Sequence, residues 1–117
     1  MTRFNQYFKR EEFECPDCGK DTVDAELLQV LTDLRVHCGQ PITVNSGARC
    51  ERHNQDIGAS KFSQHLLSKA ADIVVREFSP TEVYHLLDKW HPDKYGIGLY
   101  DNFVHIDVRK NRARWEG

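Results

Sequence analysis

Two segments of the chain place apolar residues at helical spacing. In residues 24–38 the apolar positions recur every three or four residues, which predicts a helix with one buried face. Asp24 suits the position that caps the start of this helix, and Gly39 suits the position just after its end. Residues 80–90 show the same spacing. This second helix is predicted to begin at Ser79-Pro-Thr-Glu, a capping box with proline at the first helical position. We therefore expect two core helices.

Shorter apolar runs predict strands. Residues 41–45 and 70–75 are rich in β-branched side chains, which favour extended structure. The polar segment 48–57 between them is expected to contain a short helix. Residues 1–22 mix aromatic and charged side chains and are predicted to form an N-terminal arm that packs on the domain, whereas residues 110–117 are predicted to be a solvated tail.

A hairpin is predicted near the end of the chain, because residues 96–100 and 103–108 flank the turn-forming residues 101–102. Side chains alternate along a strand, so His105 and Asp107 share one face while the apolar residues beside them face the core. Together these elements predict an α+β fold with a small, mainly antiparallel sheet flanked by helices.

The composition is that of an ordinary globular chain. Its 117 residues suit one domain spanning residues 1–117, with 29% charged and 39% hydrophobic residues. The net charge of −2 gives no electrostatic support for nucleic-acid binding. No apolar run approaches the roughly 20 residues of a membrane span, and the N-terminus lacks the apolar region of a signal peptide. We therefore expect a monomer that is made in the cytoplasm and does not insert into membranes.

The cysteines offer a weaker signal. Cys15 and Cys18 form one Cys-x-x-Cys pair, which resembles half of a zinc knuckle. Cys38 and Cys50 are too far apart in the sequence to form a second pair. Two interpretations stay open: reduced, partly buried thiols, or a structural zinc completed by two further ligands.

His65, Asp72 and His105 form the main candidate site. Asp72 is followed directly by an apolar run that is predicted to be a buried strand. A carboxylate in such a place is costly to bury without a partner. A divalent metal is one such partner, with His65 and the strand residue His105 as further ligands. Two imidazoles and one carboxylate are the protein ligands of a catalytic zinc site whose fourth position is open. The alternative is a domain without metal, in which His65 and Asp72 form a plain hydrogen bond.

These motifs resemble a known family, the zinc D-alanyl-D-alanine carboxypeptidases and the related phage endolysin peptidases. The resemblance is closest to the small single-domain members. It rests on five segments in the same order along the chain: residues 8–13 with the cysteine pair, residues 44–49, Ser63-x-His65-x6-Asp72, residues 96–100 and residues 103–109.

The resemblance implies a hedgehog and D-alanyl-D-alanine-peptidase-like fold with one zinc ion on His65, Asp72 and His105. It also implies that Arg49 lies near a substrate carboxylate or the developing oxyanion. Ser63 is expected at the site, hydrogen-bonded to a ligand or to substrate, and Gln64 is expected to face the cleft. Where the family usually has glycine three residues after the first histidine, this chain has Ser68.

The general base is the second point at which the chain departs from the family. Many relatives have Glu or Asp three residues before the last histidine, and this chain has Asn102 there. Asp107 is predicted to be the base because it shares a strand face with His105. The alternatives are that Asp101 is the base, or that Asp107 orients His105 or pairs with Arg109.

The expected function is therefore metal-assisted hydrolysis of peptide bonds in bacterial peptidoglycan stems, of the D-alanyl-D-alanine carboxypeptidase or endopeptidase type. The alternative is a catalytically weak or inactive zinc-containing module that binds the cell wall or belongs to a phage tail. In both cases the protein would act at the cell wall. Without a signal peptide, it would leave the cytoplasm by a different route, such as phage lysis or incorporation into a virion.

Overall fold

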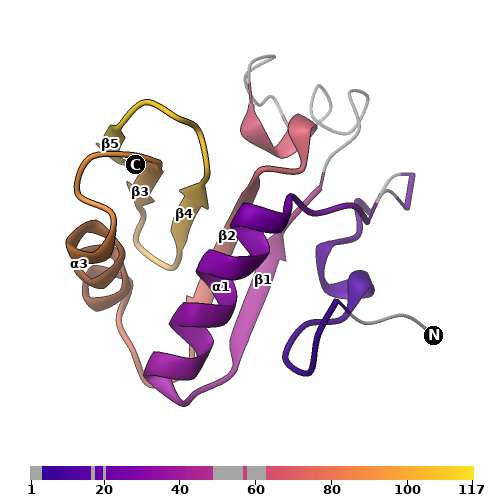
Figure 1. Ribbon diagram of the computed structural model, residues 1–117, viewed down its shortest axis with the longest axis horizontal. Coiled ribbons are helices and arrows are strands. Elements are labelled where there is room, and N and C mark those ends of the chain that lie inside the picture. Colours follow the sequence, from indigo (N-terminus) through magenta and orange to yellow (C-terminus); the bar gives the residue numbers. More distant parts are fainter. Residues whose placement is uncertain (1–3, 17, 20, 49–56, 58–62) are drawn as a thin grey trace.

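A five-stranded sheet forms the centre of the protein, with the strand order β1-β2-β4-β3-β5 (Figure 1). The computed structural model describes residues 4–16, 18, 19, 21–48, 57 and 63–117. The strands are β1 (Ile42–Ser46), β2 (Ala70–Val75), β3 (Gly96–Leu99), β4 (Val104–Asp107) and β5 (Ala113–Glu116). Neighbouring strands are antiparallel except β3 and β5, which are parallel. The predicted α+β fold with a mainly antiparallel sheet is confirmed.

Both long helices begin and end close to the predicted residues. Helix α1 spans Ala25–Cys38, and the Asp24 side chain accepts hydrogen bonds from two backbone N–H groups of its first turn. Gly39 follows in the left-handed conformation, with φ of 65°, which glycine adopts at little steric cost. Helix α3 spans Pro80–Trp90 and begins with the predicted capping box. Within the described ranges, no helix is long and apolar enough to cross a membrane.

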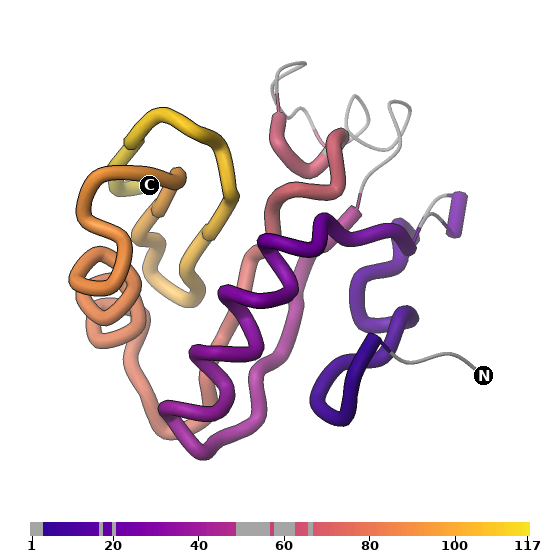
Figure 2. The backbone as a smooth tube through the Cα atoms, in the orientation of Figure 1, coloured from indigo at the N-terminus to yellow at the C-terminus, as the bar shows by residue number. Residues whose placement is uncertain are grey.

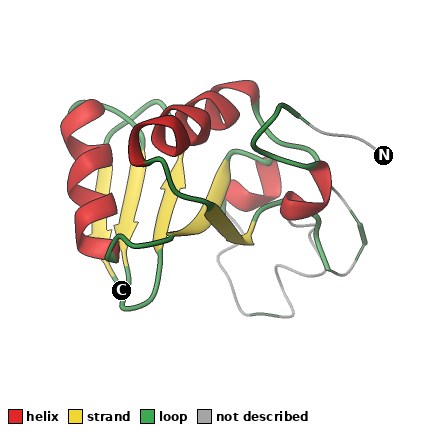
Figure 3. Cartoon of the chain, turned by 90° about the horizontal axis from the view of Figure 1, so that it is seen from below, coloured by secondary structure: helices red, strands yellow, loops and turns green. Residues whose placement is uncertain are grey.

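The helices pack against one face of the sheet. Figure 1 shows α1 across β1 and β2 and α3 beside β3, and in Figure 3 the two long helices border the strands. The N-terminal segment contributes Phe8 and Phe13, both 1% exposed; Phe8 precedes the short 3-10 helix η1 (Arg10–Phe13), and Phe13 is its last residue. Its aromatic residues therefore belong to the core. The core also contains Leu27, Val30, Leu31, Leu34, Ile42, Ala71, Ile73, Val75, Val83, Leu87, Tyr95, Ile97, Val104, Ile106 and Val108.

The C-terminal segment is a strand, so the predicted solvated tail at residues 110–117 is wrong. Residues Ala113–Glu116 form β5, and the chain returns to lie beside β3 (Figure 2). The Arg114 side chain is half-buried in contact with α3, where its Nε donates to Asp88 Oδ1 at 2.7 Å. Charged residues in this segment hide its alternation between the two sheet faces, which is why hydrophobic periodicity missed it. The short helix expected in residues 48–57 lies, apart from its two ends, outside the described residues.

Leu31 on α1 provides a test of the packing between this helix and the sheet. Its side chain is fully buried, so Leu31→Ala should leave a cavity and lower the free energy of unfolding by about 2–5 kcal/mol. Val36 on the same helix is 59% exposed, so Val36→Ala should change that free energy by about 0.5 kcal/mol or less. Chemical denaturation measures both, and equal effects of the two substitutions would contradict the packing of α1.

Candidate metal centre

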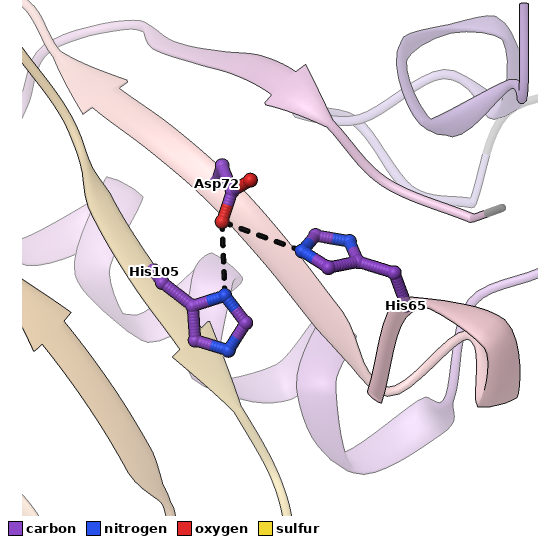
Figure 4. Close-up of side chains that lie close together, drawn as sticks. All are labelled: His65, Asp72 and His105. Atoms are coloured by element: carbon purple, nitrogen blue, oxygen red, sulfur yellow. Dashed lines mark hydrogen bonds and ion pairs between the residues drawn. The ribbon is translucent and has the colours of Figure 1, made fainter. Parts of the chain in front are cut away.

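Three side chains from different elements converge beside the sheet (Figure 4). His65 comes from the 3-10 helix η2 (Gln64–Leu67), Asp72 from β2 and His105 from β4, and all three are buried. Asp72 and His105 are directly paired in the register of their strands, so both side chains leave the sheet on the same face. One potential ligand atom from each residue lies within 4.8 Å of the other two. The structure thus brings together the three residues that the sequence analysis grouped.

Asp72 stands between the two histidines. Its Oδ1 lies 2.9 Å from His105 Nδ1 and 3.4 Å from His65 Nε2 (Figure 4). The two imidazole rings meet edge to face, with centroids 5.2 Å apart. Ligand atoms of a tetrahedral zinc, each at about 2.0–2.1 Å from the ion, lie about 3.3 Å from one another. The observed separations are close to that value.

The orientation of His65 leaves one ring nitrogen directed at the centre. Its Nδ1 lies 2.7 Å from the carbonyl oxygen of Gly47, which can only accept, so Nδ1 bears the proton. Its Nε2 is buried and has no hydrogen-bond partner among the described residues. A buried polar atom without a partner is unfavourable, and a lone pair in this position suits a metal ion. The residues present therefore fit zinc.

The turn that presents His65 is held by the residues around it. The Ser63 hydroxyl accepts a hydrogen bond from the His65 backbone N–H at 3.2 Å, and Gln64 lies half-buried in the same turn. Ser68 ends the turn in the left-handed region, with φ of 60°. Glycine adopts this conformation more readily, which explains why the resembling family usually has glycine at the position of Ser68. A hydrogen bond of 2.6 Å between the hydroxyls of Ser68 and Thr22 supports the serine in this chain.

Asp107 holds the opposite side of the His105 ring. Its Oδ2 accepts from His105 Nε2 at 2.7 Å and from Arg109 Nη2 at 2.7 Å. Its Oδ1 accepts from the backbone N–H of Gly96 at 3.1 Å and from Arg109 Nε at 2.8 Å. With its proton on Nε2, His105 turns Nδ1 toward Asp72. Carboxylates orient metal-binding histidines in this way in many proteins.

These contacts bear on the predicted base role of Asp107. The carboxylate is fully buried, and its pKa is lowered to about 2: burial opposes ionisation, but the hydrogen bonds from His105 and Arg109 outweigh burial. A general base works best when its pKa lies near the working pH. The contacts favour the alternative in which Asp107 orients His105 and pairs with Arg109. The base role of Asp107 stays a prediction, as does that of Asp101, which is exposed in the turn after β3.

The electrostatic environment of the centre is suited to a cation. Burial acts against ionisation of Asp72, but the hydrogen bond with His105 and the nearby His65 imidazole hold the pKa of this carboxyl below its usual range. Burial also acts against protonation of His105, yet the adjacent Asp107 and Asp72 carboxylates raise the pKa of the imidazole. The two carboxylates therefore stabilise positive charge at His105, where a metal ion would compete with the proton on Nδ1.

Other predicted site residues fall outside this cluster. Arg49, expected near the substrate, lies outside the described residues, as does Cys50. Cys15 is buried and Cys18 is exposed. Among the described residues, the histidine–aspartate–histidine set is the group whose ligand atoms lie close enough to hold a metal, and it includes no cysteine.

Sequence reasoning missed the two glycines that help to position the ligands. The Gly47 carbonyl is a main-chain acceptor, and the break in the strand pattern at Ser46-Gly47 was the available signal for it. Gly96 leaves room for the carboxylate beside it, because a Cβ there would lie 2.5 Å from Asp107 Oδ2. Its signal was the alternation of glycines in Gly96-Ile-Gly.

The structure is thus a small α+β domain with a buried set of two imidazoles and one carboxylate that could hold a metal ion. A family model described as peptidase M15 matches residues 6–107, which include all three converging residues. The chain therefore belongs to the peptidase M15 family, a zinc D-alanyl-D-alanine carboxypeptidase-type family, and the resemblance drawn from the motifs is confirmed. A search of curated proteins found no match.

The contact between Gly47 and Phe13 gives a test of how His65 is held. A Cβ on Gly47 would lie 2.8 Å from the Phe13 Cα, which is main chain and cannot move aside alone. Gly47→Ala should displace the carbonyl that accepts from His65 and weaken zinc affinity by about 10–100-fold. Gly39→Ala is the control, because it strains the end of α1 without touching the centre. Competition with a chelator measures both, and wild-type affinity in Gly47→Ala would refute this role.

Asp107→Asn separates the two roles of that carboxylate. If Asp107 orients His105, the neutral amide should weaken zinc affinity by about 10–100-fold, because it loses the charge that pairs with Arg109 and His105. If Asp107 is the general base, zinc should stay bound while hydrolysis falls by about 10²–10⁴-fold. We expect the first result. Asp101→Asn serves as the exposed control and should keep wild-type zinc affinity.

Proposed function

We propose that this chain is a zinc metallopeptidase that hydrolyses peptide bonds in the stems of bacterial peptidoglycan, as a D-alanyl-D-alanine carboxypeptidase or an endopeptidase. Its membership of the peptidase M15 family supports peptide hydrolysis. The metal assignment depends mainly on His65, whose buried Nε2 has no hydrogen-bond partner among the described residues and faces Asp72. The choice of cell-wall peptides as substrate is supported by the resemblance of the sequence motifs.

The proposed ligands are His65 through Nε2, His105 through Nδ1 and Asp72 through Oδ1. Three protein ligands leave a fourth position of a tetrahedral ion open, as in catalytic zinc sites. When bound, zinc supplies Lewis-acid polarisation of the scissile carbonyl and lowers the pKa of water at the site. The chain's own contribution is orientation: the Gly47 carbonyl keeps the proton of His65 on Nδ1, and Asp107 keeps that of His105 on Nε2.

Substrate binding is assigned to Arg49, Ser63 and Gln64. The planar guanidinium of Arg49 suits a substrate carboxylate or the developing oxyanion, because it donates two parallel hydrogen bonds. Ser63 and Gln64 directly precede His65, so a peptide at the metal would pass close to both. The proposed site of action is the cell wall, which the protein would reach through phage lysis or as part of a virion.

A second candidate function is a zinc-containing cell-wall or phage tail module with little or no activity. Two observations favour it. Asn102 occupies the position where many relatives have an acidic base. The nearby carboxylate of Asp107 is fully buried and already accepts hydrogen bonds on both oxygens, so it is poorly placed to take a proton from water.

Metal analysis combined with mass spectrometry of digested peptidoglycan stems tests the proposal. We expect one zinc ion per chain, cleavage of a stem peptide bond, loss of cleavage with a chelator and recovery with added zinc. Asp72→Ala should lose both zinc and cleavage, whereas Val36→Ala, at an exposed position of α1, should lose neither. Cleavage that persists after zinc is removed would refute a metallopeptidase. Bound zinc without any cleavage would favour the binding module.

A further inference from the structure

A row of paired residues crosses the sheet from the metal centre to its edge. Asp72 on β2 pairs with His105 on β4. His105 in turn pairs with Gly98 on β3, and Gly98 pairs with Trp115 on β5. Directly paired residues project from the same face of a sheet. Trp115 therefore shares the face of the metal centre and lies on the side of His105 away from Asp72.

Gly98 provides the space that the Trp115 side chain occupies. A Cβ added to Gly98 would collide with the indole nitrogen of Trp115. Glycine within a strand weakens it, and such a glycine often marks a place where another group approaches closely. The indole reaches across β3 to the His105 ring, and the two ring centroids are 5.1 Å apart.

Tyr100 and Phe103 continue this surface, and with Trp115 they form what we call the aromatic wall. The Trp115 Nε1–H donates to the Tyr100 hydroxyl at 2.9 Å. Tyr100 stacks on Phe103 with centroids 4.5 Å apart and an interplanar angle of 9°. All three side chains are half-buried, and none belongs to the hydrophobic core on the helix side of the sheet.

We propose that Trp115 is a specificity-determining residue that contacts a small aliphatic side chain of the peptide next to the scissile bond. The inference rests on the proposed function, because the occupant is the peptide held at the metal centre. The wall is continuous with that centre through the contact between Trp115 and His105. An indole combines a large apolar surface with few rotatable bonds, so it binds an alanine-sized side chain with little loss of conformational freedom.

The indole is also held in place before any ligand arrives. Its Nε1–H is engaged by Tyr100, and the Arg109 guanidinium carbon lies 5.3 Å from the centre of the ring. Arg109 is in turn fixed by Asp107, the residue that orients His105. The same side chains therefore position a proposed metal ligand and the wall beside it. This arrangement predicts that a peptide at the metal touches Trp115 without a large rearrangement.

Fluorescence tests this contact directly, because the chain has two tryptophans and they lie in different places. Trp90 packs against His37 between the long helices, with ring centroids 5.0 Å apart. In zinc-loaded Trp90→Phe, Trp115 is the only tryptophan. A pentapeptide stem ending in D-alanyl-D-alanine should change its emission saturably within the first seconds of mixing. In Trp115→Phe, where Trp90 is the only tryptophan, the same titration should give no change.

Kinetics on the same peptide give an independent readout. Trp115→Ala should raise KM by about tenfold with zinc content unchanged, a loss at the lower end of the roughly 10–200-fold that a single methylene group is worth in an apolar pocket. Trp115→Phe should recover most of that loss. Gly98→Ala, which displaces the indole without removing it, should reproduce the higher KM.

The outcomes separate this inference from the proposed function. Wild-type protein that binds zinc and cleaves the stem, with a silent Trp115 and an unchanged KM in Trp115→Ala, would overturn the inference alone. Failure of the wild type to bind zinc or the stem would overturn both. Binding without cleavage, with a responding Trp115, would support the contact in the non-catalytic module.

Discussion

The site depends on the burial of one carboxylate. Asp72 lies within β2, where four of the five other residues are buried, and its pKa stays below the usual range because His105 and His65 offset the cost of burial. Two imidazoles on one carboxylate oxygen form a compact set whose spacing is close to that of ligands around zinc. The turn η2 and the pairing of β2 with β4 both position side chains around this carboxylate.

Small residues allow the supporting groups to approach the centre. Gly47 lies against the Phe13 main chain, so its carbonyl can reach His65. Gly96 leaves room for the Asp107 carboxylate, and Gly98 leaves room for the Trp115 indole. Strand β3 therefore contributes almost no side chain to the functional face. Its neighbours β4 and β5 supply the side chains that lie over it, which links the metal centre to the aromatic wall.

Much of the fold could be predicted because its signals are local. The spacing of apolar residues and the caps at Asp24 and Ser79 specify α1 and α3 within the sequence itself. β5 was missed because its charged residues are satisfied by tertiary contacts, such as the Arg114 ion pair with Asp88. The grouping of His65, Asp72 and His105 could also be predicted, because the alternation of side chains along the strands and the resemblance to the family both pointed to these residues. For Asp107, the contacts with His105 and Arg109 were one of the predicted alternatives, whereas the hydrogen bond from the Gly96 main chain could not be predicted, because it depends on how the two strands of the hairpin meet.

X-ray absorption at the zinc edge of the purified protein tests the central claim most directly, since it identifies the atoms that bind the metal. The account predicts two imidazole nitrogens and carboxylate oxygen, at about 2.0–2.2 Å, with no sulfur neighbour. That signature should disappear in Asp72→Ala. Sulfur neighbours at about 2.3 Å would place the zinc on cysteines and contradict the assignment of His65, Asp72 and His105.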